Sequence, residues 1–282
     1  MNHRSKTQTV LMVLLGGIVS LALLPAVIPP GDPDLLSLSQ PPSLKHPMGT
    51  SPAGIDVFRL SLEAGRRAGL EAVLAAALTL FLGAIIGGTA GIKPRSWFDY
   101  LQSVCARVLE ATGPLLPTIC IAAVAPRLEP ASLGVVVSLF AWPPVATVVR
   151  GEIIHEGERL YVEAARSIGV SPFRLFVACY FPAMLARLRP WCFGLFSAYV
   201  ALFGALGFLG VGNGVERTLG FLLFDSLGHL RGEPWYFIGL LVAFLVLLGV
   251  AAPFVRSLLS VPSFDSPDFG SSGERVKRVL TE

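Results

Sequence analysis

A continuous apolar stretch decides the fold class of this chain: AVLAAALTLFLGAIIGGTAGI, residues 72–92. It contains no charged side chain, and as an α-helix it is about 30 Å long, which matches the hydrocarbon thickness of a bilayer. Lipid offers the backbone no hydrogen-bond partners, so a spanning run of this kind must satisfy its own N–H and C=O groups as a helix. We therefore predict a transmembrane helix over residues 72–92.

The rest of the chain has the same character. Of its 282 residues, 53% are hydrophobic and only 15% are charged, whereas soluble proteins carry roughly 25% charged residues. This composition argues against an ordinary water-soluble enzyme. Five further apolar segments are each long enough to span a bilayer, which predicts an all-α polytopic membrane protein with six transmembrane helices. They cover residues 10–28, 101–125, 131–149, 190–215 and 234–255.

The distribution of Lys and Arg orients these helices. If the N-terminus is cytoplasmic, the basic residues favour the inside by roughly two to one, as the positive-inside rule requires. The first span is longer than a signal-peptide core and no A-x-A cleavage site follows it, so we expect an uncleaved anchor and both termini in the cytoplasm. The predicted organisation is an anchor (1–28), an extracytoplasmic, periplasmic loop (29–69), a five-helix core (70–260) with a cytoplasmic loop (150–189), and a cytoplasmic tail (261–282).

The cytoplasmic loop is too amphipathic to span the membrane. Residues 158–168 are rich in helix-forming side chains, and Gly169 permits a positive-φ turn that other residues resist. Ser171 can cap a second helix, Pro172 suits the first turn of that helix, and Pro182 is expected to end it. The pattern predicts a compact helix–turn–helix platform on the cytoplasmic face.

Within this loop, Glu163-Ala164-Ala165 is followed by Gly169 and Pro182 at the spacing of the EAA motif. The loop therefore resembles the coupling helices of ABC-importer permeases, which dock onto a cytoplasmic ATPase subunit. Three more segments resemble the dipeptide/oligopeptide/nickel permease family, and its C-type subunits in particular. They are His46-Pro47-Met48-Gly49-Thr50 before the second span, Asp99 with Arg107, Glu110 and Pro114 or Pro117 in the third, and residues 205–212, ALGFLGVG.

The resemblance implies a transmembrane permease subunit of an ATP-driven ABC importer for peptides or similar small solutes, in the bacterial inner membrane. It implies no catalytic, cofactor-binding or metal site in this chain, because ATP and Mg would bind to partner subunits. The implied partners are a second homologous permease subunit, cytoplasmic ABC ATPase subunits, an external solute-binding protein and membrane lipid. The implied ATPase-coupling residues are Glu163, Ala164, Ala165, Arg166, Gly169 and Pro182.

Four residues of the third apolar segment are candidates for lining or gating the translocation path: Arg107, Glu110, Pro114 and Pro117. Charges within a span are costly and usually face a pathway or each other. Arg107 and Glu110 are three positions apart and share one helix face, so a local ion pair is the alternative. The two prolines can kink a helix, either as a fixed bend or as one that moves during opening.

Other functional classes lack their signatures. The sequence has no Gly-Lys pair of a Walker A loop, no HExxH and no CxxC pair, and its basic residues form no single stripe for nucleic acid. Gly83, Gly87, Gly88 and Gly91 favour tight helix packing. An ion-gradient-driven secondary transporter and a membrane assembly protein without a transport path are the alternatives to an ABC importer.

Overall fold

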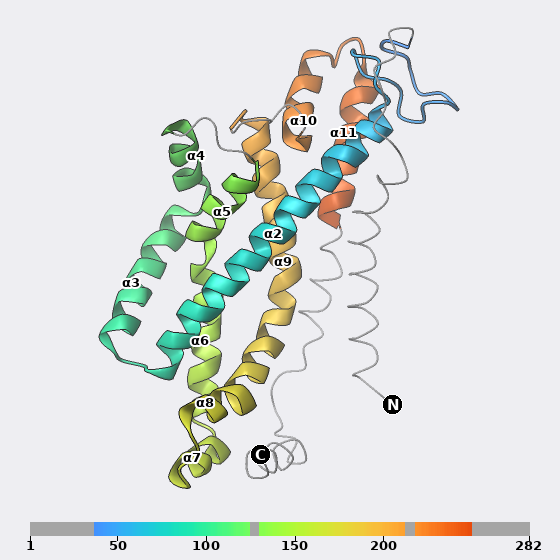
Figure 1. Cartoon of the computed structure of the whole chain (residues 1–282). Coiled ribbons are helices and arrows are strands. Elements are labelled where there is room, and N and C mark those ends of the chain that lie inside the picture. The colour runs from blue at the N-terminus through green and yellow to red at the C-terminus, as the bar shows by residue number, and fades with distance from the viewer. Residues whose placement is uncertain (1–36, 125–129, 212–217, 250–282) are drawn as a thin grey trace, which may run out of the picture. The chain divides into compact units, whose positions relative to one another are not determined.

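The computed structural model describes residues 37–124, 130–211 and 218–249 (Figure 1). This part of the chain is helical, and its β structure is limited to an isolated antiparallel bridge between Thr50 and Asp56. The prediction of an all-α protein is confirmed for these residues. The predicted anchor (1–28) and tail (261–282) lie outside the described residues.

The described helices follow one another with short connections. They are α2 (Val57–Ile92), α3 (Trp97–Thr112), α4 (Leu115–Val124), α5 (Pro130–Ala141), α6 (Pro143–Gly157), α7 (Leu160–Ser167), α8 (Pro172–Leu175), the π-helix η1 (Phe176–Tyr180), α9 (Phe181–Phe208), α10 (Leu219–Gly228) and α11 (Pro234–Gly249).

Among these helices, α2 alone is long and apolar enough to cross a bilayer without a partner. Two bent pairs pass the same criteria together: α3 with α4, bent by 81°, and Ser132–Ala141 of α5 with α6, bent by 46°. The predicted segments 190–215 and 234–255 contain shorter apolar helices. The described residues thus provide one to three spans, and the predicted count of six is not confirmed.

Glycine and proline explain the two bends. Gly113 ends α3 with φ +67° and donates its N–H to the Leu109 carbonyl at 2.9 Å, and Pro114 follows it. Pro143 occupies the first turn of α6, where its missing N–H costs no helical hydrogen bond. The segments predicted as single spans over 101–125 and 131–149 are therefore each divided into two helices.

Helix α2 begins earlier than the sequence pattern indicated. It starts at Val57, inside the range expected for the extracytoplasmic loop (29–69). Asp56 caps this end, because its Oδ1 accepts hydrogen bonds from the backbone N–H groups of Phe58 at 2.8 Å and Arg59 at 3.4 Å. A short helix, α10, was also not expected; Thr218 caps it by accepting the N–H of Phe221.

The chain divides into two compact units. Of the described residues, the first comprises 37–75, 118–124, 130–135, 195–211 and 218–249, and the second comprises 76–117 and 136–194. Helices α2, α4, α5 and α9 each contribute residues to both units. The two units are described separately below.

Close contact between α9 and α10 organises the first unit. A Cβ added to Gly220 would lie 2.0 Å from the Gly204 carbonyl oxygen, so the two helices meet backbone to backbone at this point. One added to Gly239 of α11 would lie 3.0 Å from Val57. The Tyr236 hydroxyl of α11 also donates to the Asp225 carboxylate of α10 at 3.4 Å.

In the second unit, the glycines of α2 pack against α6. A Cβ added to Gly87 would lie 2.3 Å from the Ala146 carbonyl oxygen, and one added to Gly83 would lie 2.6 Å from Val145. Gly91 meets Ile153 in the same way, at 2.9 Å. The prediction of tight helix packing is confirmed for these three glycines, because only residues without a side chain allow this approach.

Candidate coupling platform

The platform consists of the end of α6, helices α7 and α8, and η1, all within the second unit (Figure 1). A buried carboxylate fixes the turn between α6 and α7. Glu156 is only 2% exposed; it accepts a hydrogen bond from the Tyr161 hydroxyl and pairs with Arg159 Nε at 2.9 Å. Both partners belong to the start of α7, so this network holds α7 at a set angle to α6.

Gly169 forms the turn between α7 and α8, as predicted. Its φ is +81°, and its N–H bonds to the Arg166 carbonyl at 3.0 Å while the N–H of Val170 bonds to the Ala165 carbonyl at 3.1 Å. These two bonds make a Schellman helix end, which satisfies carbonyls that α7 leaves free. The Ser171 hydroxyl accepts the Arg174 N–H at 3.4 Å, so the predicted cap of the second helix is also confirmed.

A second side-chain contact links α7 to η1. Arg166 Nη2 donates to the Tyr180 hydroxyl at 2.6 Å, and Tyr180 is 4% exposed. A Cβ added to Gly157 at the end of α6 would lie 3.3 Å from the same hydroxyl oxygen. Arg166 therefore holds the platform together internally, which its place in the EAA motif did not reveal.

One face of α7 packs against no other helix of the described part of the chain. Val162 and Ala165 are buried at 0% and 8% exposure, whereas the opposite face is exposed. That exposed face carries an apolar side chain, a carboxylate and two small residues at the i, i+3, i+4 and i+7 spacing of one helix face: Leu160 (83% exposed), Glu163, Ala164 and Ser167.

The expectation that Pro182 ends the second platform helix is wrong. Pro182 is the second residue of α9, and η1 joins α8 to α9 without leaving helical geometry. Phe181 donates its N–H to the carbonyl of Phe176, an i→i+5 bond typical of a π-helix. Such a wide turn rearranges the backbone hydrogen bonds ahead of a proline, and the chain therefore continues as a helix.

The candidate pathway residues lie on α3 and α4. Arg107 and Glu110 are both exposed, and Arg107 Nε donates to the Ser103 carbonyl at 3.0 Å. The ion pairs of the described residues do not include one between Arg107 and Glu110. Pro114 lies at the break between the two helices, and Pro117 lies within α4.

A buried ion pair connects α3 with α6, the helix that leads to the platform. Asp99 is 4% exposed, and both its carboxylate oxygens accept from the guanidinium of Arg150, with Nη2 to Oδ2 at 2.9 Å. Oδ2 also accepts the backbone N–H of Arg95 at 2.9 Å. The sequence placed Asp99 in a motif and Arg150 at a loop boundary, but nothing in it indicated that they pair.

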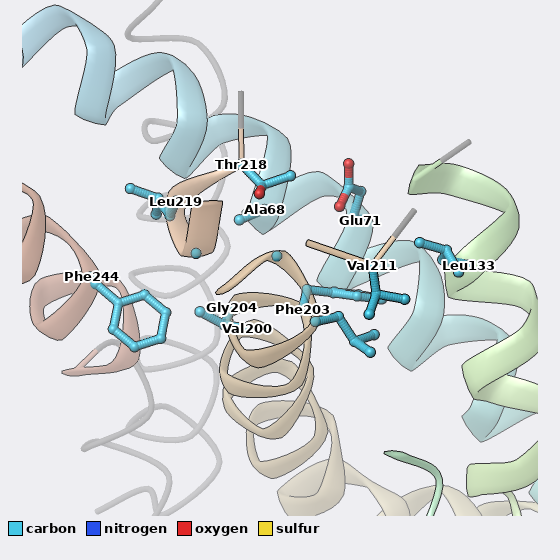
Figure 2. A pocket seen from close by; sticks show the side chains of 13 residues that line it. Ala68, Glu71, Leu133, Val200, Phe203, Gly204, Val211, Thr218, Leu219 and Phe244 are labelled. Carbon is cyan, nitrogen blue, oxygen red and sulfur yellow. The ribbon is translucent and has the colours of Figure 1, made fainter. Parts of the chain in front are cut away.

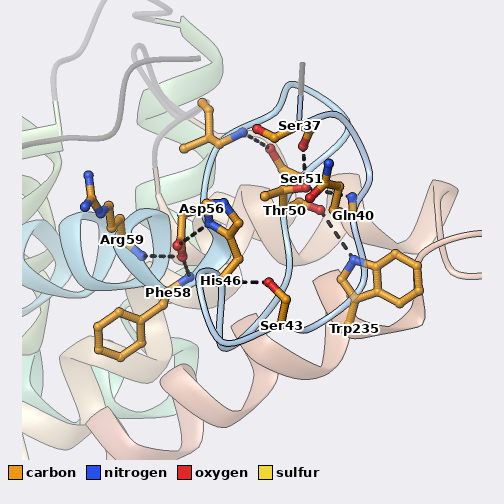
Figure 3. A network of polar contacts seen from close by, with 11 residues as sticks. Ser37, Gln40, Ser43, His46, Thr50, Ser51, Asp56, Phe58, Arg59 and Trp235 are labelled. Carbon is orange, nitrogen blue, oxygen red and sulfur yellow. Dashed lines mark hydrogen bonds and ion pairs between the residues drawn. The ribbon is translucent and has the colours of Figure 1, made fainter. Parts of the chain in front are cut away.

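The segment before α2 forms a structured cap within the first unit (Figure 3). His46 Nδ1 lies 2.8 Å from Asp56 Oδ2, and the Thr50 hydroxyl donates to the Ser37 carbonyl at 2.6 Å. Trp235 Nε1 of α11 donates to the Thr50 carbonyl at 3.4 Å. Gly49 has φ +74°, and a Cβ there would lie 2.5 Å from the Trp235 ring. The segment His46–Thr50 therefore packs against α11.

Comparison with known proteins identifies the class. Residues 79–257 match the family described as "Binding-protein-dependent transport system inner membrane component". The chain belongs to this family, and its resemblance to ABC-importer permeases is confirmed.

Two individual relatives have 29% sequence identity to this chain. The oligopeptide transport system permease protein OppC of Mycobacterium tuberculosis is 29% identical over 264 residues, covering 90% of this chain and 89% of that protein. A Brucella abortus protein provisionally named a peptide permease protein is 29% identical over 185 residues, which is 65% of this chain. The match spans 60% of the length of this Brucella relative.

Proposed function

We propose that this chain is the transmembrane permease subunit of an ATP-driven importer that takes up peptides or similar small solutes. Membership of the binding-protein-dependent family supports import through an inner-membrane complex. The names of the Mycobacterium and Brucella relatives support peptides as the solute class. ATP and Mg would bind to ATPase partners rather than to this chain.

The exposed face of α7 is the observation that carries the coupling part of the proposal. Leu160 and Ala164 offer an apolar surface that a partner backbone can approach, and Glu163 adds a charge beside them. Two sets of contacts hold this helix in place. Glu156 of α6 binds Tyr161 and Arg159, and Arg166 of α7 donates to Tyr180 of η1. A partner that moves α7 therefore moves the platform as one body.

Helix α6 offers a route for that movement into the membrane-embedded part of the second unit. It begins at Pro143 and ends in the platform, and Arg150 in its middle is paired with Asp99 of α3. Closure of the ATPase subunits would shift α6 and α3 together. These helices would then have two arrangements, and nucleotide binding to the ATPase subunits would set the balance between them. Our candidates for lining or gating the path remain the four residues on α3, on α4 and at the break between them: Arg107, Glu110, Pro114 and Pro117.

The remaining partners and the orientation follow from the same proposal. A second homologous permease subunit would complete the translocation path, an external solute-binding protein would deliver the solute, and lipid would cover the apolar helices. We place both termini and the loop at 150–189 in the cytoplasm, the loop at 29–69 outside, and the core at 70–260 in the membrane.

An Ala164→Trp substitution tests the coupling surface. A bulky ring on the exposed face of α7 should prevent docking of the ATPase subunits without disturbing the buried face, so co-purification and ATP-driven peptide uptake should be lost. Ala186→Trp, at an exposed small residue of α9 outside the platform, is the matched control and should retain both. Glu163→Ala combined with Gly169→Pro should also insert normally but uncouple uptake.

The outcome of these assays can contradict the proposal in two ways. Unchanged uptake in Ala164→Trp would remove α7 as the coupling surface. Absence of any co-purifying ATPase subunit with the wild-type chain in mild detergent would remove the importer assignment and favour a secondary transporter or an assembly protein.

A further inference from the structure

A small pocket lies within the first unit, where residues of α2, α9 and α10 meet (Figure 2). Its walls are mainly apolar, with Leu133, Val200, Phe203 and Phe244 among them. Three glycines keep it open: Gly204, Gly207 and Gly220 all line it, and a Cβ on Gly207 would lie 2.5 Å from the Thr218 hydroxyl oxygen.

Among the described residues that line this pocket, Glu71 alone is charged (Figure 2). It is half-buried and directly precedes the uncharged residues 72–92, so it lies at the edge of the hydrocarbon layer. With the proposed orientation, this is the side on which a solute arrives. A carboxylate that is half-buried against apolar walls loses part of its hydration, and it therefore favours a cationic partner.

The neighbouring polar groups leave the Glu71 carboxylate available. Arg67, one helical turn away, attracts the Glu71 carboxylate, but its Nη2 donates to Glu63 at 2.9 Å rather than to Glu71. Among the described residues, none donates a hydrogen bond to Glu71. The pocket thus combines a carboxylate that accepts no hydrogen bond from the described residues with the aromatic rings of its walls.

The chemistry that fits this combination is a compact cation with several N–H donors. A primary ammonium group can donate to a carboxylate and also rest against aromatic faces. The pocket is only about 30 Å³, which suits such a group and excludes a whole peptide. One end of a solute can therefore enter it while the remainder stays outside.

We propose that the pocket beside Glu71 receives the protonated primary amine of the transported solute. The solute class would then be peptides, or other small solutes, with a free amino group. This inference rests on the proposed importer function, and it adds a recognition step within the permease itself to the selection made by the binding protein.

Labelling of Glu71 tests the pocket directly. The purified permease–ATPase complex in nanodiscs is treated with a hydrophobic carbodiimide, and labelling at Glu71 is measured by mass spectrometry relative to the exposed Glu158. Millimolar tri-alanine should reduce labelling of Glu71 by about tenfold, as expected when a desolvated ion pair forms, whereas N-acetyl-tri-alanine should not. N-acetyl-Ala-Lys-Ala carries its only amine on the lysine side chain and therefore tests which amine binds. Protection of Glu71 by this peptide would show that the pocket accepts any primary ammonium group, and no protection would show that it requires the terminal one.

Three labelling results would overturn the inference: no reaction at Glu71, no protection by tri-alanine, or equal protection by the acetylated peptide. Uptake into proteoliposomes containing the full complex separates this failure from failure of the proposed function. If the wild-type complex takes up tri-alanine with ATP, Glu71→Gln should lower that uptake about tenfold and Leu74→Gln, at an exposed neighbour, should not. Equal uptake by Glu71→Gln overturns the inference alone, whereas no uptake by the wild type overturns the proposed function.

Discussion

Asp99 of α3 and Arg150 of α6 form a two-point ion pair, although 51 positions separate them in the sequence. Asp99 is almost completely buried, and Ser96 caps the helix turn that carries it by accepting the Asp99 N–H at 3.2 Å. The pair links the start of one helix to the middle of another. It is thus the fixed point from which α6 extends to the platform.

The first prediction concerns this pair. Asp99→Asn and Arg150→Gln should each destabilise the protein by roughly 2 kcal/mol, because each leaves one partner's charge uncompensated. The cost is below that of a fully buried pair, since the Arg150 side chain is 32% exposed. The double variant should be more stable than the sum of the two losses implies, as measured by thermal melting in detergent. Strictly additive losses would show that the two groups do not interact.

The second prediction compares two adjacent glycines of α2. Gly87→Ala places a methyl group 2.3 Å from the Ala146 carbonyl oxygen, so α2 and α6 must separate and the melting temperature should fall sharply. Gly88→Ala is the matched control, because its Cβ meets only Ile153 Cδ1 at 3.8 Å, an ordinary contact. Its melting temperature should stay the same or rise, since alanine favours helix over glycine. Equal effects would show that the two helices do not pack at this position.

The third prediction isolates the backbone conformation of the platform turn. Gly169→Ala should cost about 1–2 kcal/mol, because its φ of +81° is strained for a residue with a Cβ. Apart from the adjoining backbone, no described atom lies within 4 Å of the added Cβ there or at Gly151 in α6. Gly151→Ala therefore controls for the added methyl group and should be neutral or slightly stabilising. A neutral Gly169→Ala in thermal melting would contradict the turn geometry.

The fourth prediction concerns the contact between α7 and η1. Tyr180→Phe removes the hydroxyl that Arg166 contacts at 2.6 Å, and should cost only about 1 kcal/mol in stability. Because α7 then loses one of its two braces, ATP hydrolysis should drive less uptake per ATP in proteoliposomes. Tyr100→Phe, at a residue that is 70% exposed on α3, should leave the ratio of uptake to hydrolysis unchanged. A normal ratio in Tyr180→Phe would show that this contact plays no part in coupling.

Several parts of the platform could be predicted from the sequence because they depend on neighbours along the chain. The positive φ of Gly169 and the capping role of Ser171 follow from residue type and local spacing, and both are confirmed. Pro182 was predicted incorrectly for a related reason. Local rules treat proline as a helix end, whereas the π-turn of η1 accommodates it and lets α9 continue.

The sequence by itself determined the membrane character, the helical class and the position of the platform, since apolar length and residue spacing are local properties. Only the tertiary structure decided which distant groups meet. The pairs Asp99 with Arg150 and Arg166 with Tyr180, and the pocket beside Glu71, depend on how helices pack. Packing is set by the simultaneous fit of many side chains, so no short stretch of sequence contains it.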